Sequence, residues 1–174
     1  VCVGAVTAIY LAQVNTDIML KFRQGLSIAA LVIALDQISK YYVMQVFAWG
    51  DLKQVTGFFD LVRAHNTGAA FSLFADQPGW QRGFFIAVAS IASIFILFLL
   101  RKDSGSTLSK LSLSLILGGA LGNLIDRLAH GYVVDFLSVH AGSYYWPAFN
   151  IADSAITIGA VLLIWYSLIQ PKHD

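Results

Sequence analysis

The sequence contains no glutamate and only one cysteine, Cys2. A single cysteine excludes an internal disulfide framework and a metal cluster built on cysteine. Charged residues make up only 12% of the 174 residues, against about 25% in a typical soluble domain. The formal net charge is +1, so the chain lacks the basic field of a nucleic-acid-binding protein, and we expect no nucleic-acid partner. Its 57% of hydrophobic residues instead indicates an integral membrane protein.

Four stretches are apolar enough to cross a bilayer, which takes about 20 residues per helix. One of them has no charged residue at all, whereas the first contains Asp36 and Lys40. These two residues are four apart and can meet on one helix face. The predicted spans are residues 25–48, 83–100, 108–125 and 151–170. We therefore predict an all-α membrane protein with four transmembrane helices.

Lysine and arginine near the span ends predict the orientation, because cytoplasmic loops collect these residues. They precede the first span, occupy the linker between the second and third, and follow the fourth: Lys21, Arg23, Arg101, Lys102, Lys110 and Lys172. Both termini, including a tail at 171–174, are thus expected in the cytoplasm, with longer loops at 49–82 and 127–150 outside. Residues 1–24 begin with an apolar piece too short to span. It could be a nonstandard start, an expression remnant or an interfacial piece, and its role stays open.

The two outer loops have the composition of strands rather than helices. Residues 55–74, VTGFFDLVRAHNTGAAFSLF, mix β-branched and aromatic side chains with glycine and Asn-Thr-Gly turn signals. Residues 132–140, YVVDFLSVH, have a similar strand-like composition in the second loop. We expect a small β-hairpin that sits on the outer ends of the helices.

Ionisable side chains at membrane depth are the strongest functional signal, because they are costly unless paired or hydrated. Asn150 and Asp153 lie three residues apart at the outer end of the last span and share one helix face, and Asp135 lies 18 residues upstream of Asp153. Two carboxylates close together share one proton, and such a pair can activate water as in aspartic proteases. A helix N-cap is the simpler alternative, and spacing alone does not decide between the two.

The third span carries the sequence GGALGNLIDRL. Gly118 and Gly122 form a G-x-x-x-G pair, which favours close helix packing over a catalytic role. Asp126 and Arg127 are adjacent, and we interpret them as a structural ion pair at the membrane surface rather than as catalytic groups. In the first outer loop, Asn66 could contact a substrate backbone or serve as an ordinary turn residue.

Other chemistries fit the sequence less well. The four histidines lack metal-ligand spacing, and no G-x-S-x-G elbow is present, so a metal site is disfavoured and a serine intramembrane protease is a weak alternative. A small transporter with a proton path through Asp36, Asp126 and Asp153 is a rival from another class, although these acids cluster toward one side. A structural membrane subunit, whose polar residues only join helices, is a third possibility.

Five motif blocks follow one another along the chain: DQISK (36–40), NTGAAFS (66–72), GGALGNLIDR (118–127), VVDF (133–136) and PAFNIADSAITIG (147–159). Together they resemble lipoprotein signal peptidase, also called signal peptidase II, over about residues 25–170. The resemblance implies a bacterial aspartyl endopeptidase of the inner (cytoplasmic) membrane. It further implies four transmembrane helices, an extracytoplasmic β-cradle and an active site at the outer face. Residues 1–24 do not match the family's N-terminus.

The resemblance also implies a substrate and a set of site residues. The substrate is a prolipoprotein with a diacylglyceryl-modified cysteine, and cleavage just before that cysteine releases the signal peptide. The catalytic pair falls on Asp135 and Asp153. Positions that bind substrate or support the pair fall on Asp36, Asn66, Gly119, Asn123, Arg127 and Asn150. Asn66 and Arg127 are expected to position the substrate, and Asp36 and Asn123 to brace the bundle. The cyclic peptide globomycin inhibits this family, and we expect the chain to act without metal or cofactor, in membrane lipid, as a monomer.

Overall fold

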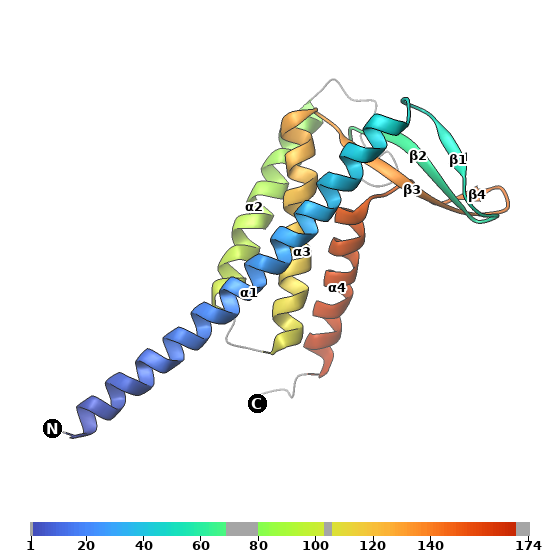
Figure 1. Ribbon diagram of the computed structural model, residues 1–174. Coiled ribbons are helices and arrows are strands. Elements are labelled where there is room, and N and C mark those ends of the chain that lie inside the picture. The colour runs from blue at the N-terminus through green and yellow to red at the C-terminus, as the bar shows by residue number, and fades with distance from the viewer. Residues whose placement is uncertain (1, 69–79, 103–105, 170–174) are drawn as a thin grey trace.

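The computed structural model describes residues 2–68, 80–102 and 106–169, with the backbone alone for residues 2–18 and 20. Within these ranges four helices are long and apolar enough to cross a membrane. They are α1 (Cys2–Val46), α2 (Trp80–Lys102), α3 (Thr107–Ala129) and α4 (Ile151–Ile169), and they form a bundle (Figure 1). The helical part of the predicted fold class is therefore confirmed.

Helix α1 is longer than the span expected from the sequence. The candidate membrane span within it covers Lys21–Val46, and the helical backbone continues back to Cys2. This extension projects beyond the bundle at the end away from the sheet (Figure 1). Residues 2–24 contain no proline and a single glycine, Gly4, so nothing in this stretch stops the helix from propagating.

Helix α3 lies at the centre of the bundle and contacts α1, α2 and α4. Small residues permit these contacts. A Cβ on Gly118 would lie 2.7 Å from the Cβ of Val32 in α1, and one on Gly119 would overlap the carbonyl oxygen of Ala152 in α4. The close packing predicted for the G-x-x-x-G stretch is thus present. The apolar core consists of Ala29, Ile96, Leu100, Leu113 and Leu117.

In the described parts of both outer loops, four short strands form one antiparallel sheet in the order β1-β2-β3-β4. They are β1 (Leu52–Gln54), β2 (Phe59–Asn66), β3 (Val133–Ala141) and β4 (Tyr144–Tyr145). The predicted hairpin is present as β1–β2, and pairing of β3 with β2 extends it into a sheet that both outer loops share. The sheet lies where α1 and α3 end and α4 begins (Figure 1). This confirms the fold class of four membrane helices with a small β element.

An arginine fixes the sheet to the end of α1. Arg63, in β2, donates from Nη1 to the carbonyl oxygens of Met44 at 3.1 Å and Phe47 at 2.8 Å. The last carbonyls of a helix have no partner within the helix, so this side chain satisfies groups that would otherwise need water. The contact sets the position of β2 relative to the bundle.

The segment before α4 pairs with β3 and so brings the helix to the sheet. The backbone N–H of Phe149 donates to the carbonyl of Leu137 at 2.9 Å, and the N–H of Leu137 donates back to Phe149 at 2.8 Å. Asn150 follows immediately, and α4 begins at Ile151. The first turn of α4 therefore lies beside the middle of β3, where Asp135 is located.

Candidate active site

Asp135 is buried in β3 and its carboxylate is held from two sides. The β2–β3 register places Asn66 opposite Val133, so Asn66 and Asp135 project from the same face of the sheet. Asn66 donates from Nδ2 to Asp135 Oδ2 at 3.1 Å. Asn150 donates from Nδ2 to Asp135 Oδ1 at 2.7 Å. Each carboxylate oxygen thus accepts one amide N–H.

Asp153, in the first turn of α4, forms a reciprocal cap with Asn150. The backbone N–H of Asp153 donates to Asn150 Oδ1 at 2.9 Å, and the backbone N–H of Asn150 donates to Asp153 Oδ2 at 3.2 Å. Asp153 Oδ1 is left for another donor and accepts from Asn123 Nδ2 at 2.7 Å. The N-cap alternative is therefore correct as local structure. It is compatible with a role in a site, because the cap uses only one carboxylate oxygen.

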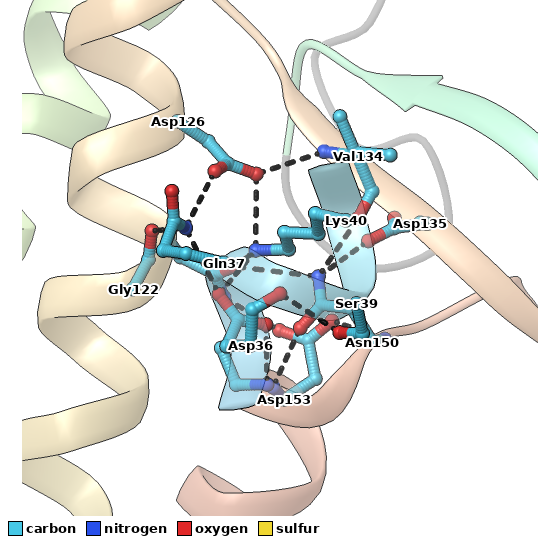
Figure 2. Close-up of polar contacts among 12 residues, drawn as sticks. Asp36, Gln37, Ser39, Lys40, Gly122, Asp126, Val134, Asp135, Asn150 and Asp153 are labelled. Atoms are coloured by element: carbon cyan, nitrogen blue, oxygen red, sulfur yellow. Dashed lines mark hydrogen bonds and ion pairs between the residues drawn. The ribbon is translucent and has the colours of Figure 1, made fainter. Parts of the chain in front are cut away.

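Asn150 joins the two aspartates. It is fully buried, and its side-chain Nδ2 also lies 3.3 Å from Asn123 Oδ1. Figure 2 shows Asp135, Asn150 and Asp153 gathered between β3 and the start of α4. A single residue thus bonds to Asp135 through its side chain and to Asp153 through its backbone. The structure brings together the two acidic residues that the sequence singled out.

The environment of Asp135 favours its protonated form. Burial, and then the negative charge of Asp153, raise the pKa of Asp135 from its ordinary value of 3.8 to about 7. The hydrogen bonds from Asn66 and Asn150 and the charge of Lys40 oppose this shift, because they stabilise the carboxylate. Asp135 therefore retains a proton up to near-neutral pH.

A cavity of about 780 Å³ opens in front of the two aspartates. Asp135 and Asp153 both line it, together with Asn66, Asn123 and Arg127. Its remaining wall is mostly apolar and comes from β2, β3, the segment before α4 and the outer face of α4. This wall consists of Ala64, His65, Thr67, Gly68, Val133, Trp146, Pro147, Ala148, Phe149, Ser154, Ile156, Thr157 and Ile158. The cavity thus combines a small polar centre with an apolar surround, as ligand sites commonly do.

The predicted ion pair between Asp126 and Arg127 is wrong. The two side chains point to different partners, because adjacent helical residues do not face each other. Asp126 is buried and pairs with Lys40 Nζ at 3.0 Å. Arg127 faces the cavity and donates from Nη2 to the carbonyl of Gly68 at 3.2 Å. Its guanidinium also lies 5.2 Å from the ring centre of Phe85.

Asp36 and Gly119 lie behind the cavity and support the start of α4. Asp36 Oδ1 accepts the backbone N–H of Ala152 at 3.0 Å, which ties α1 to the first turn of α4. Gly119 leaves room for the carbonyl of the same residue. Neither residue lines the cavity. Both fix the residue that immediately precedes Asp153.

Sequence reasoning placed Lys40 opposite Asp36 but missed its other contacts. The expected pair is present, with Nζ 2.8 Å from Asp36 Oδ2. Lys40 also reaches Asp126 and donates to Asn123 Oδ1 at 3.0 Å. The spacing in DQISK predicts only the contact within α1, because contacts between helices depend on how α1 crosses α3. Likewise, no local pattern in the sequence indicates the direct contact between Asn123 and Asp153.

Across the described part of the chain, no group of three histidine, cysteine or acidic side chains is placed to hold a metal ion. His65 lines the cavity but stacks between Trp49 and Tyr132, with ring centres 5.6 and 3.8 Å away. Burial, followed by the charges of Arg63 and His130, lowers the pKa of His65. The carboxyl groups that line the cavity are those of Asp135 and Asp153.

The signal peptidase (SPase) II family matches residues 28–169. The chain belongs to this family. It is 54% identical to the lipoprotein signal peptidase of Janthinobacterium sp. (strain Marseille) over 143 residues, which cover 82% of this chain and 87% of that protein. It is 53% identical to the lipoprotein signal peptidase of Ralstonia nicotianae over 139 residues, which cover 80% of each.

Solved structures show the same fold. A bacterial membrane enzyme determined by the in meso method at 1.9 Å gives a TM-score of 0.76 at 33% identity, covering 85% of this chain and 94% of that chain. A second one, at 2.3 Å, gives 0.75 at 32% identity, covering 87% and 94%. The chain is thus a peptidase and a multi-pass membrane protein. Membership of the family supports processing of lipoprotein signal peptides and favours the enzyme over the transporter and structural-subunit alternatives.

Proposed function

We propose that the chain is an aspartyl endopeptidase that removes the signal peptide from diacylglyceryl-modified prolipoproteins, cutting just before the lipidated cysteine. One observation carries the proposal: Asp135 and Asp153 are linked through Asn150 and line the same cavity. Membership of the signal peptidase II family supports the substrate class. The proposal needs no metal, because a carboxyl pair that shares a proton supplies both an acid and a base.

In this proposal the two carboxyls have different tasks. Asp135, with its raised pKa, carries the shared proton and gives it to the carbonyl oxygen of the scissile bond. Asp153, whose oxygens accept N–H groups from Asn123 and Asn150, takes a proton from the attacking water. The water oxygen bonds to the carbonyl carbon and forms a tetrahedral diol. A diol hydroxyl then returns its proton to Asp135 as the carbonyl re-forms, the C–N bond breaks, and Asp153 protonates the departing amine of the lipidated cysteine.

The cavity suits a membrane-embedded substrate. Ile156 and Ile158 place apolar surface on the α4 side, and the side chain of Ile158 is exposed. The signal helix can lie in the bilayer against this side, while lipid holds the acyl chains. Arg127 and Asn66, which line the polar centre, are placed to position the peptide backbone near the carboxyls.

The location follows from the charge distribution. Arg101 and Lys102 lie at the end of α2, at the opposite end of the bundle from the sheet (Figure 1). Lysine and arginine mark the cytoplasmic side, so we place the sheet and the site at the outer face of the bacterial inner membrane and both termini in the cytoplasm. We further propose that the chain acts as a monomer and that globomycin occupies the cavity.

The decisive experiment is cleavage of a purified diacylglyceryl-prolipoprotein, followed as a shift in gel mobility. D135N and D153N should remove all detectable cleavage while remaining folded in detergent. D51N is the matched control, because Asp51 is exposed in the loop before β1 and should retain full activity. Chelators should leave cleavage unchanged, and globomycin should block it. Substantial cleavage by either D135N or D153N would remove the basis of the proposal.

A further inference from the structure

Lys40 is a buried cation with three partners and no access to water. It is 1% exposed. Its Nζ lies 2.8 Å from Asp36 Oδ2, 3.0 Å from Asn123 Oδ1 and 3.0 Å from Asp126 Oδ2. An ammonium group has three N–H donors and no acceptor, so the three contacts use all of its hydrogen-bonding capacity. Figure 2 shows Lys40 reaching from α1 toward Asp126 on α3.

The contact with Asn123 determines which way that amide faces. An asparagine side chain can rotate by half a turn and exchange its oxygen and its NH₂ group. The ammonium of Lys40 can only donate, so the atom of Asn123 that faces it must be the oxygen. The NH₂ group then points to the opposite side, where it donates to Asp153 Oδ1 at 2.7 Å. The flipped amide would place its NH₂ against the ammonium and leave two donors facing each other.

The amide of Asn150 has the same fixed orientation. Its Nδ2 donates to Asn123 Oδ1 and to Asp135 Oδ1, and its Oδ1 accepts the backbone N–H of Asp153. Asn123 Oδ1 therefore accepts two donors, one from Lys40 and one from Asn150. Donation runs in one direction, from Lys40 toward the carboxyl of Asp153.

We propose that Lys40 is a positioning residue of the peptidase: by donating to Asn123 Oδ1 it holds the Asn123 amide with its N–H toward Asp153 and keeps that carboxyl an acceptor, ready to take the proton of water. This inference rests on the function proposed above and assigns to α1 a task beyond bracing the bundle. Lys40 does not line the cavity, so it acts through Asn123 and not on the substrate.

The charge of Lys40 adds a second effect on the same pair. Carboxyl groups surround it from every element packed against it: Asp36 on α1, Asp126 on α3, and, further away, Asp135 on β3 and Asp153 on α4. Its positive charge lowers the pKa of Asp135. Removing the charge should therefore raise that pKa further and let the pair keep its proton to higher pH.

The test is a double-mutant cycle with K40M and N123A, singly and combined. The quantity compared is kcat for cleavage of the lipidated prolipoprotein. A residue that acts through Asn123 should matter only while Asn123 is present. We expect K40M to lower kcat by about 100-fold in the wild-type background, as for lost supporting residues, and by less than about threefold in N123A. KM should change by less than about threefold, since substrate binding is untouched. K53M, at an exposed lysine in β1, is the control and should match the wild type.

The pH dependence of kcat supplies a second measurement, which would not change if Lys40 only held the helices together. The alkaline limb of kcat, where the pair loses its shared proton, should move to higher pH in K40M and stay in place in K53M. Additive losses in the cycle, or a folded K40M with wild-type kcat and an unmoved alkaline limb, would overturn the inference. If K40M does not fold, K40L, which likewise has no N–H donor in its side chain, takes its place in the same cycle with the same criteria. Cleavage by D135N would instead defeat the proposed function, so the two failures are distinguishable.

Discussion

The two ends of the helix bundle bury polar groups in different ways. At the sheet end, Asp36, Lys40, Asn123 and Asp126 bond from one helix to another, and Asn150 bonds across to β3. At the opposite end, two fully buried hydroxyls of α3 bond back to their own helix: Ser112 Oγ donates to the carbonyl of Leu108 at 2.7 Å, and Ser114 Oγ donates to the carbonyl of Lys110 at 2.6 Å. Close apolar packing joins the helices there, as between Leu100, Leu113 and Leu117.

The two kinds of contact serve different purposes in the bundle: one holds the helices together, and the other orients their polar side chains. Apolar contacts between small and aliphatic side chains hold the helices close together, but they do not select which polar groups face each other. Hydrogen bonds between helices give orientation, because each donor must meet its acceptor. The protein places its directional contacts around Asp135 and Asp153 and its apolar contacts at the other end of the bundle. Substitutions at the two ends should therefore affect different observables.

The largest effect should come from removing Asn150. N150L removes the donor to Asp135 and the cap of α4 together, and it leaves two buried carboxyls without their shared partner. We expect kcat to fall by about 10²- to 10³-fold, as for other lost preorganised donors, with a lower melting temperature. N150S is the matched variant, because a serine hydroxyl can still cap the helix without adding a third carboxyl beside Asp135 and Asp153, but it is shorter than the amide that donates to Asp135. N150S should melt above N150L and be nearly as inactive; a fully active N150S would contradict the role of the Asn150 donor.

The next largest effect is the pH dependence of stability that comes from Asp135, at the sheet end of the bundle. The pKa of Asp135 is raised when the protein folds, so the folded state binds its proton more tightly than the unfolded state does. The stability from this proton is fully present below about pH 4, near the ordinary pKa of an aspartate, and is lost as pH rises through about 7. A neutral amide removes this dependence. The melting temperature of D135N should therefore rise relative to the wild type between about pH 4 and 7, and level off above that range. A constant or falling difference across this range would contradict the raised pKa.

Much of this organisation was predictable from the sequence. Apolar runs located the four helices, β-branched and aromatic stretches located β2 and β3, and the spacing of Asn150 and Asp153 indicated a shared helix face. The resemblance to signal peptidase II named Asp135 and Asp153, whose roles stay proposals. These patterns involve neighbouring residues or residues at fixed spacings, so they can be recognised in a single sequence.

The contacts between helices were not predictable in the same way. Asp126 was assigned to its neighbour Arg127, whereas it bonds to Lys40, 86 positions before it. Asn123 was expected to brace the bundle, yet it donates to Asp153. Such pairings depend on helix crossing angles and depths, which follow from the packing of small residues such as Gly119 and not from any local pattern.

Two glycines give a matched test of close packing. G119A places a methyl group into the carbonyl of Ala152, next to Asp153, so α3 and α4 must separate. We expect a loss of about 1–3 kcal/mol in the free energy of unfolding, with reduced activity because the first turn of α4 moves. G83A in α2 meets nothing within 4 Å, and alanine favours a helix by about 0.5–1 kcal/mol. It should keep or raise the melting temperature at unchanged activity. Equal effects of the two substitutions would deny that α4 is held close at Gly119.

The smallest effect should come from the end away from the sheet. S114A removes a fully buried hydroxyl whose hydrogen bond stays within α3, so its acceptor, the carbonyl of Lys110, keeps its helical environment. The substitution leaves no partner on another helix unsatisfied, and we expect the free energy of unfolding to change by less than about 1 kcal/mol. Activity should equal that of the wild type at every pH, because no contact to the carboxyl pair is altered. A shifted pH profile in S114A would show that the two ends are coupled, and that orientation at the site depends on polar contacts along the whole of α3.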